Sequence, residues 1–278
     1  MARAAVPDPR REAEILLGFV LGKDRGGVVA RRPDPLDDAS SARFEALLAR
    51  RETREPFQYL TGEQEFMGLS FRVDARVLVP RPETEGVVIA ALGLGLPPSA
   101  SVADLGTGSG CIAIALAVAR PDLRLFALDL SESALAVARD NAKRHGAAGR
   151  IVFAHADLVA PPVEWEGRMD AVLSNPPYVA EDEWTGLEPE VRDHEPRQAL
   201  VPGPTGLEAY GRAAVTALRL LRPGGHLVVE LGFKREAGAK EAAIRAGLTH
   251  LETVPDLRGI PRVLVARKGC PLCPARAK

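Results

Sequence analysis

The sequence carries almost no net charge, few cysteines and no long apolar run, and each shortage excludes a class of protein. Its 36 Lys and Arg residues nearly balance 37 Asp and Glu residues, which argues against a basic protein that coats nucleic acid by charge alone. No apolar run approaches the roughly 20 residues of a membrane span, and the Arg-containing N-terminus lacks the apolar core of a secretory signal. Because three cysteines cannot form a disulfide framework, we expect a globular protein of the reducing cytoplasm, with no membrane partner.

Aromatic residues are also scarce, at 5%, so the core must be built largely from Ala, Leu and Val. The beginning of the chain has helical periodicity. One apolar stripe consists of Ala13, Leu16, Leu17, Val20 and Leu21. A second helix is predicted with Ser40 or Ser41 as its N-cap. It would bury Phe44, Leu47 and Leu48.

Residues 64–79 mark a change of pattern. They contain two short β-prone runs on either side of Asp74 and Ala75, which predicts a β-hairpin. We therefore expect a small N-terminal helical domain over residues 1–62 and a hairpin linker over residues 63–80.

Strand and helix patterns alternate over the next part of the chain, residues 81–268. The predicted strands are Ser101–Leu105, Leu123–Leu128, Ile151–His155, Met169–Ser174, His226–Leu231, Leu251–Val254 and Arg262–Ala266. Helical runs lie at Cys111–Ala119, Ser131–His145 and Leu207–Leu221. This alternation predicts an α/β domain with a parallel sheet covered by helices on both faces. The last two strands are joined by only a short segment, PDLRGIP, so that pair should be antiparallel.

A few residues with reactive side chains have a simpler structural interpretation. Pro82, followed by two glutamates, is typical of the first turn of a helix, although this segment could equally contact a substrate. Cys111 is expected to be a small packed side chain, and His194 a solvated loop residue. Cys270 and Cys273 lie in a tail, residues 269–278, and two cysteines are too few for a structural zinc site.

A glycine-rich turn connects the strand at 101–105 to the helical run after it. It reads Asp104-Leu105-Gly106-Thr107-Gly108-Ser109-Gly110. Glycines here let the backbone approach a ligand closely, and the start of the helix offers free N–H groups. The spacing is G-x-G-x-G rather than the dinucleotide fingerprint G-x-G-x-x-G, and we expect a nucleoside-type cofactor.

Acidic residues follow the neighbouring strands. Asp129 ends one strand, where a carboxylate can accept hydrogen bonds from both hydroxyls of a ribose, and Asp157 follows the next. Because ligands of open α/β sheets bind outside the carboxyl ends of the strands, we expect Asp104, Asp129 and Asp157 to line that edge together.

The motif Asn175-Pro176-Pro177-Tyr178 stands directly after an apolar strand, again at the carboxyl edge. Prolines have a fixed φ and no N–H, which leaves their carbonyls as acceptors, and Asn175 adds a side-chain acceptor. Two acceptors and the flat face of Tyr178 suit a planar NH₂ group on a conjugated system. Hydrogen bonds to both of its N–H groups would stabilise the positive charge that grows on the nitrogen as it attacks an electrophile.

With these motifs the sequence resembles the release factor glutamine methyltransferases, the PrmC/HemK family. The resemblance runs over roughly residues 10 to 267. Besides DLGTGSG and NPPY it includes EPFQYLTGEQEFMGLSF (55–71), VLVPRPETE (77–85), ALDLSESALAVARDNA (127–142), HEPRQAL (194–200) and DLRGIPRVLVARK (256–268). It implies a class I methyltransferase, with a Rossmann-like sheet of seven strands whose last strand is antiparallel, and an N-terminal helical domain that recognises the substrate.

The resemblance also implies a cofactor, a substrate and a set of site residues. The cofactor is S-adenosylmethionine, held by residues 106–110, with Asp129 on the ribose and Asp157 and Leu158 beside the adenine. Asn175 would lie close to the reactive centre. The substrate is the glutamine of the Gly-Gly-Gln motif in peptide chain release factors, and its amide would meet the four residues of the NPPY motif.

Other functions share parts of this pattern. Enzymes that methylate the amino group of adenine or cytosine also carry Asn-Pro-Pro-Tyr, but they need a basic surface, and this chain has a formal charge of −1. No direct nucleic acid partner is therefore expected. A related enzyme that methylates a glutamine of a ribosomal protein shares the catalytic motifs, and only the N-terminal half separates it. An inactive binding module and a nicotinamide oxidoreductase are the alternatives of another class. The G-x-G-x-G spacing argues against the oxidoreductase, which would also leave the NPPY motif unexplained.

Overall fold

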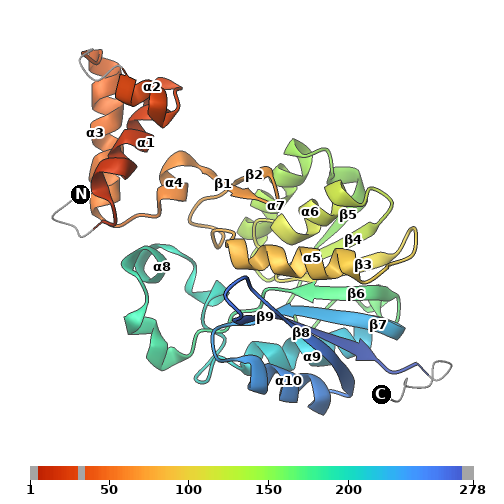
Figure 1. Cartoon of the computed structure of the whole chain (residues 1–278). Coiled ribbons are helices and arrows are strands. Elements are labelled where there is room, and N and C mark those ends of the chain that lie inside the picture. Colours follow the sequence, from red (N-terminus) through yellow and green to blue (C-terminus); the bar gives the residue numbers. More distant parts are fainter. Residues whose placement is uncertain (1–5, 31–34, 271–278) are drawn as a thin grey trace.

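The computed structural model describes residues 6–30 and 35–270, so most of the expected tail, Cys273 included, lies outside the described residues. The N-terminal part is helical, as predicted (Figure 1). Its helices are α1 (Pro9–Leu21), α2 (Arg25–Ala30), α3 (Asp38–Glu52) and α4 (Phe57–Thr61). Leu16, Leu47 and Leu60 of three of these helices form a small buried cluster. Figure 1 shows α1 to α3 standing apart from the sheet, to which α4 leads.

Helix α3 begins earlier than predicted. Asp37 is its N-cap, and the Asp37 carboxylate accepts a hydrogen bond of 2.8 Å from the backbone N–H of Ser40. Ser40 is therefore the third helical residue rather than the cap, and Ser41 lies one residue further in. Asp caps a helix about as well as Ser, and Asp37 precedes both predicted caps, so the helix begins at the earlier position.

The predicted hairpin is present, but its turn is elsewhere. Strands β1 (Glu63–Phe66) and β2 (Leu69–Arg72) are antiparallel and turn at Met67 and Gly68, which both have positive φ values, of 52° and 75°. A two-residue turn of this kind favours glycine at its second position, so the turn forms here and not at Asp74 and Ala75. Phe66 and Phe71 are buried against the core beside the main sheet, which anchors the hairpin to the α/β domain.

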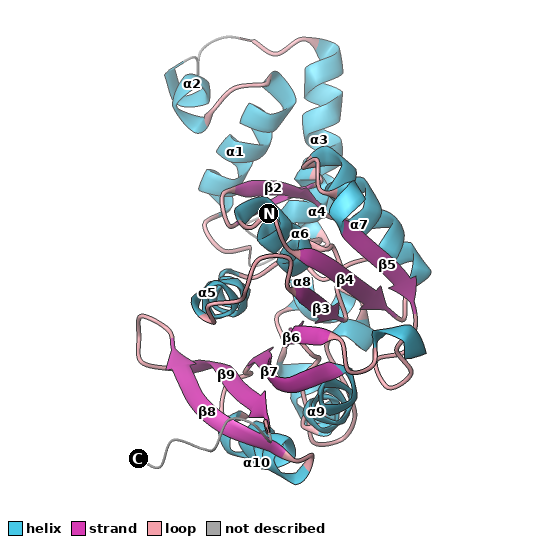
Figure 2. Ribbon diagram, turned by 90° about the vertical axis from the view of Figure 1, so that its right-hand side faces the viewer, coloured by secondary structure: helices cyan, strands magenta, loops and turns pink. Residues whose placement is uncertain are grey.

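A seven-stranded sheet forms the centre of the α/β domain (Figure 2). Its strands, in the order β5-β4-β3-β6-β7-β9-β8, are β5 (Ile151–His155), β4 (Arg124–Asp129), β3 (Ser101–Leu105), β6 (Met169–Ser174), β7 (Leu221–Glu230), β9 (Pro261–Lys268) and β8 (Leu248–Pro255). The first five strands in this order are parallel, and β9 is antiparallel to both of its neighbours. The prediction of a parallel sheet with an antiparallel last strand is thus confirmed.

Helices cover both faces of the sheet, which gives two apolar cores (Figures 1 and 2). One face carries α5 (Glu85–Gly93), α6 (Cys111–Ala119) and α7 (Glu132–Arg144), and the other carries α9 (Glu208–Leu220) and α10 (Glu236–Arg245). Helix α6 consists entirely of apolar residues, and seven of its nine side chains are buried.

Strand order reverses beside β3, because β4 and β5 lie on one side of it and β6 and β7 on the other. In open α/β sheets this switch point leaves a crevice at the carboxyl ends of the strands, where ligands bind. A long connection from β6 to α9 runs past that crevice and contains α8 (Pro189–His194) together with short 3₁₀ turns. Over residues 6–30 and 35–270, no helix combines the length and the apolar character needed to cross a membrane.

Candidate active site

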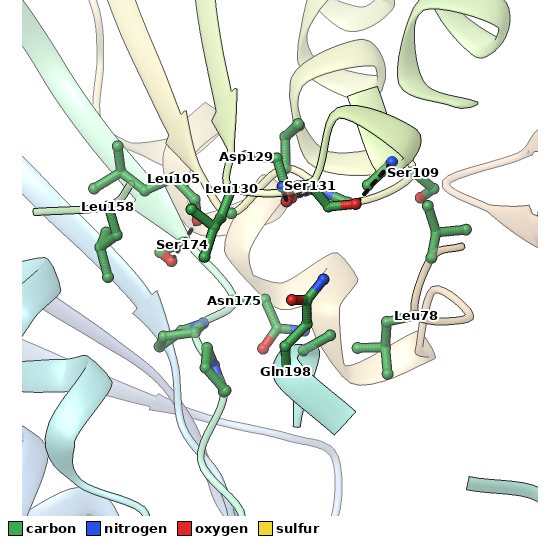
Figure 3. A pocket seen from close by; sticks show the side chains of 18 of the residues that line it. Leu78, Leu105, Ser109, Asp129, Leu130, Ser131, Leu158, Ser174, Asn175 and Gln198 are labelled. Atoms are coloured by element: carbon green, nitrogen blue, oxygen red, sulfur yellow. Dashed lines mark hydrogen bonds between the residues drawn. The ribbon is translucent and has the colours of Figure 1, made fainter. Parts of the chain in front are cut away.

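A cavity of about 210 Å³ opens at the carboxyl ends of β3, β4 and β6. Most of the predicted site residues line it, namely Gly106, Thr107, Gly108, Ser109, Asp129, Asp157, Leu158, Asn175, Pro176 and Pro177. Figure 3 shows Asp129 and Ser131 on the opposite side of this cavity from Asn175, Gln198 and Leu78. Gly110 and Tyr178 were also predicted, and they are not among the lining residues.

The glycine turn is held against the end of β4 by backbone hydrogen bonds. The N–H groups of Gly106 and Thr107 both donate to the carbonyl of Leu128, at 2.9 Å. Gly106 and Gly108 have positive φ values of 73° and 55°, and a Cβ atom built on either would meet nothing within 4 Å. Their backbones are therefore open to the cavity, as a cofactor-binding turn requires.

Gly110 is packed more tightly than Gly106 and Gly108. Its φ is 83°, and a Cβ atom there would lie 2.8 Å from Cδ1 of Ile114 and 3.1 Å from Cβ of Ala138. The third glycine of the motif thus lets α6 and α7 approach closely, and it lies beside the cavity without lining it.

Asp129 ends β4 and faces the cavity. Its carboxylate accepts hydrogen bonds from the N–H of Gly108 at 2.8 Å and from the N–H of Ser131 at 2.9 Å. Burial raises the pKa of Asp129, and these two backbone donors oppose the rise. Because each carboxylate oxygen has two acceptor sites, both can still accept a further hydrogen bond from a ligand hydroxyl.

Asp104 does not join the other two acids, so the prediction that all three line this edge is wrong for it. Its side chain is fully buried beneath the turn, where Oδ2 accepts a 2.6 Å hydrogen bond from the Thr107 hydroxyl. Burial raises the pKa of Asp104 to about 7. Asp104 lies within β3 rather than after it, and alternate residues of a strand point to opposite faces, so its carboxylate enters the core instead of the cavity.

Asn175 is held by a chain of side-chain hydrogen bonds. Its Nδ2 donates to the Thr84 hydroxyl at 3.1 Å, and that hydroxyl donates to Oε2 of Glu230 at 2.5 Å. The hydroxyl of the preceding residue, Ser174, donates to the carbonyl of Leu105 at 2.7 Å, which ties the end of β6 to the end of β3. The NPPY segment therefore leaves the sheet at a defined point beside the glycine turn.

Tyr178 lies behind the cavity rather than in its lining. Its hydroxyl donates to Oε1 of Glu230 at 3.3 Å. Its ring packs on Gly232, where a Cβ atom would come within 2.5 Å of the ring. Burial raises the pKa of this phenol, so Tyr178 remains a neutral hydrogen-bond donor. In this structure the Tyr178 side chain packs against β7 and the residues after it, and so holds the NPPY loop in place.

The segment VLVPRPETE reaches the site through structural contacts. Arg81 pairs with Glu195 at 2.5 Å, and Glu85 accepts a 2.7 Å hydrogen bond from the N–H of Met67. Glu83 lies 3.7 Å from Arg262. None of these three charged residues of the segment lines the cavity, whereas Thr84 does.

Cys111 and His194 were both predicted to have structural rather than catalytic roles. Cys111 is buried, and burial raises the pKa of its thiol to about 12, in keeping with a packed side chain, although it also lines part of the cavity. The prediction that His194 is a solvated loop residue is wrong, because His194 ends α8 and its Nε2 lies 2.9 Å from the carbonyl of Thr53.

Sequence reasoning missed several lining residues. Thr84, Leu78 and Gln198 line the cavity, and Glu230 lies directly behind Thr84. The motifs VLVPRPETE and HEPRQAL contain the first three, but neither motif indicates that the two segments meet. They meet because the buried carboxylate of Glu195 also accepts a 3.2 Å hydrogen bond from the N–H of Val79.

The sheet order, the antiparallel β9 and the glycine turn, acid and NPPY loop at one edge define a class I methyltransferase. Comparison with solved structures supports this fold. A methyltransferase from Pyrococcus furiosus matches with a TM-score of 0.54 at 19% identity, over 84% of this chain and 100% of that chain. Two family models also match, the PrmC N-terminal domain over residues 1–62 and the methyltransferase small domain over residues 90–188.

Curated relatives specify the family. The release factor glutamine methyltransferase of Cereibacter sphaeroides is 44% identical over 267 residues, which are 96% of this chain and 94% of the relative. That of Nitratidesulfovibrio vulgaris is 43% identical over 269 residues, 95% of this chain and 90% of the relative. The chain belongs to the release factor glutamine methyltransferase family, which confirms the resemblance drawn from its motifs.

Proposed function

We propose that this protein transfers a methyl group from S-adenosylmethionine to the side-chain amide nitrogen of the glutamine in the Gly-Gly-Gln motif of peptide chain release factors. The observation that carries the proposal is the position of Asn175 and Pro176, which line the same cavity as the glycine turn and Asp129. Acceptors for an amide NH₂ thus lie beside a site suited to a nucleoside-type cofactor.

The cavity fits the proposed cofactor on its own chemistry. Gly106 and Gly108 offer open backbone, and the carboxylate of Asp129 retains acceptor sites for the ribose hydroxyls. Asp157 and Leu158 would flank the adenine at the end of β5. S-adenosylmethionine supplies a methyl group on a positively charged sulfur, so the chain itself needs only to place the acceptor nitrogen.

The chain's own residues would orient and activate the glutamine amide. The lone pair of an amide nitrogen is delocalised, which makes it a poor nucleophile. Oδ1 of Asn175 and the carbonyl of Pro176 would accept its two N–H groups and stabilise the positive charge that develops as the nitrogen attacks. Holding the nitrogen in line with the methyl group would supply much of the rate. No strong base is needed, since a proton can leave after the bond has formed.

We further propose that residues 1–62 recognise the release factor, with 63–80 as the linker and 81–268 as the catalytic domain. Contacts between the first and last of these segments support this division of roles. Arg51 and Arg54 of the helical part both pair with Glu190, at 2.9 Å and 2.5 Å. Glu190 belongs to α8, on the connection that also carries Gln198 to the cavity. A partner bound to the helices would therefore lie near the side of the cavity lined by Asn175, Pro176 and Gln198, here called the acceptor side.

Methyl transfer from radiolabelled S-adenosylmethionine tests the proposal. Purified release factor, its Gln→Asn variant in the Gly-Gly-Gln motif, ribosomal proteins and DNA are offered in parallel. We expect label on the release factor and none on the variant. Label on ribosomal protein or on DNA instead would contradict the proposed substrate and leave the methyltransferase assignment standing.

A further inference from the structure

A buried carboxylate with no part in the chemistry above lies directly behind the acceptor side of the cavity. Glu230 ends β7, and only 1% of its surface is exposed. Its two oxygens accept from two different active-site segments, Oε2 from the hydroxyl of Thr84 at 2.5 Å and Oε1 from the hydroxyl of Tyr178 at 3.3 Å. Burying a charged carboxylate is costly unless it is paired or hydrogen-bonded, and both of these hydrogen bonds of Glu230 come from residues at the active site.

The hydrogen bonds from Asn175 to Glu230 all run in one direction. An ionised carboxylate can only accept, so the single proton of the Thr84 hydroxyl must point to Glu230. The Thr84 oxygen can then only accept from its other neighbour, and it does so from Nδ2 of Asn175 at 3.1 Å. The carboxamide of Asn175 is therefore turned with its NH₂ group toward Thr84 and its Oδ1 away from it.

The opposite rotamer of this carboxamide is disfavoured by the same chain. With the amide flipped, Oδ1 of Asn175 would face the Thr84 oxygen, whose proton is already committed to Glu230. Two acceptors would then meet without a proton between them, and the NH₂ group would face the ligand. A carboxamide in that orientation cannot accept an N–H from a substrate amide.

We propose that Thr84 and Glu230 are positioning residues that fix the polarity of the Asn175 carboxamide, so that its Oδ1 is presented to the glutamine amide of the substrate. This inference rests on the proposed function, and it adds the device that gives Asn175 its role. Tyr178 contributes by holding the second oxygen of Glu230, which explains why its side chain lies behind the cavity.

The device depends on the charge of Glu230, which makes it sensitive to pH. Burial raises the pKa of Glu230 to about 7, the hydrogen bonds from Thr84 and Tyr178 oppose the rise, and the nearby charges of Glu83 and Arg262 act in opposite directions. Below that pH, protonated Glu230 can donate to Thr84, and the Thr84 proton is then free to turn toward Asn175. Turnover should therefore fall as the pH drops through this range.

A pair of substitutions at position 84 tests the hydrogen bonds directly. Thr84→Val keeps the shape and removes the hydroxyl, whereas Thr84→Ser keeps the hydroxyl. With release factor as substrate we expect Thr84→Val to lower kcat by about 10- to 100-fold, the range expected when a buried hydrogen bond is lost. Thr84→Ser should stay within about threefold of wild type, and both should bind S-adenosylmethionine nearly as wild type does. Thr253→Val, which removes a hydroxyl on the edge strand β8, outside the cavity lining, is the matched control.

The pH profile separates positioning from mere support of the loop. We expect the acid limb of kcat near pH 7 in wild type to disappear in Glu230→Gln, because a glutamine can both donate and accept and no longer imposes one direction. The limb should also disappear in Thr84→Val, which cuts the connection between Glu230 and Asn175. Asp104, whose pKa is also near 7, remains unchanged in both variants and so cannot account for that loss.

Several outcomes would overturn the inference. These are a Thr84→Val enzyme within threefold of wild type, a Thr84→Ser enzyme as slow as Thr84→Val, or an acid limb that persists in both Thr84→Val and Glu230→Gln. Thermal unfolding checks each variant, and if Glu230→Gln does not fold, the two Thr84 variants and their pH profiles decide. Failure of the wild type itself to label release factor would instead count against the proposed function.

Discussion

The two sides of the cavity are built in different ways. On the cofactor side, Gly106 and Gly108 belong to one short turn, and backbone hydrogen bonds fasten it to the end of β4 and to Asp129. On the acceptor side, Thr84 and Glu230 are 146 residues apart and meet only through side chains. One side is therefore a local structure, and the other is assembled by the tertiary fold.

This difference has a functional consequence. A change of side chain in a turn held by its backbone leaves the acceptor residues in place, so substitutions there should alter mainly cofactor affinity and, at the positive φ of Gly106 and Gly108, stability. A chain of buried side chains loses its order when one member is removed, so substitutions there should alter mainly the rate. The predictions below test this separation, beginning with the largest effect.

Asn175→Ala should have the largest effect. Removing the carboxamide deletes one of two acceptors for the charge that develops on the amide nitrogen, and we expect kcat to fall by at least about 100-fold. Affinity for S-adenosylmethionine should stay within a few fold, since the cofactor side is unchanged. Single-turnover methylation and calorimetric titration measure the two quantities, and an equal loss in both would show that the two sides are not separable.

The sequence predicted the cofactor side much better than the acceptor side. The strands at 101–105, 151–155 and 169–174 were predicted with their observed bounds, because each is a short apolar run bounded by clear breaks. Glycines and acids that follow such strands fall at one edge by topology alone. The role of Thr84 could not be predicted, because its neighbour Glu230 is placed beside it only by the packing of α5 and β7.

Errors in the sequence interpretation also have physical causes. Asp104 was placed at the edge because it starts the glycine motif, but the alternation of side chains along β3 turns it inward. Helix α10 was missed because only two small residues, Ala239 and Ala243, are buried on it, which leaves a faint apolar stripe. Gly110 was assigned to the cofactor with the rest of its motif; its close contacts are with Ile114 and Ala138, and its cofactor role stays a prediction.

A pair of glycine substitutions separates packing from cofactor binding within one turn. Gly106→Ala and Gly110→Ala both place a side chain at positive φ, which costs roughly 1–2 kcal/mol. In Gly110→Ala the new Cβ also meets Ile114 and Ala138 at 2.8 Å and 3.1 Å, so we expect about 1–3 kcal/mol of further destabilisation. Chemical unfolding measures the difference, and equal stabilities would contradict the packing role of Gly110.

Asp129→Asn should weaken cofactor binding with little effect on turnover at saturating cofactor. The asparagine keeps one acceptor oxygen but loses the charge and one acceptor for the ribose hydroxyls, and we expect Kd to rise by about 10-fold. Asp157→Asn provides a comparison at the more exposed end of the same edge, where the effect should be smaller. A fall in kcat comparable to that of Asn175→Ala would show that Asp129 serves the acceptor side as well.

The smallest effect should come from Glu195→Gln, which loosens the contact between the two segments that complete the acceptor side. Glu195 holds the N–H of Val79 and the guanidinium of Arg81, and the glutamine keeps only a neutral version of these bonds. Because Arg81 is partly exposed and the glutamine can still hydrogen-bond to both groups, we expect KM for release factor to rise only about two- to fivefold, with kcat and cofactor affinity unchanged. Glu181→Gln, which breaks a more exposed pair with Arg197 in the same connection, should leave KM as it is.

The pH dependence of KM gives a second test of the contacts of Glu195 with Val79 and Arg81. Burial raises the pKa of Glu195, against the opposing effect of Arg81, so this carboxylate takes up a proton at a higher pH than an exposed glutamate does. As the pH falls through that value, wild type loses the charged pair that the Glu195→Gln variant already lacks. The ratio of their KM values should therefore approach one at acid pH, and a ratio that stays constant would show that the charge of Glu195 does not hold the two segments together.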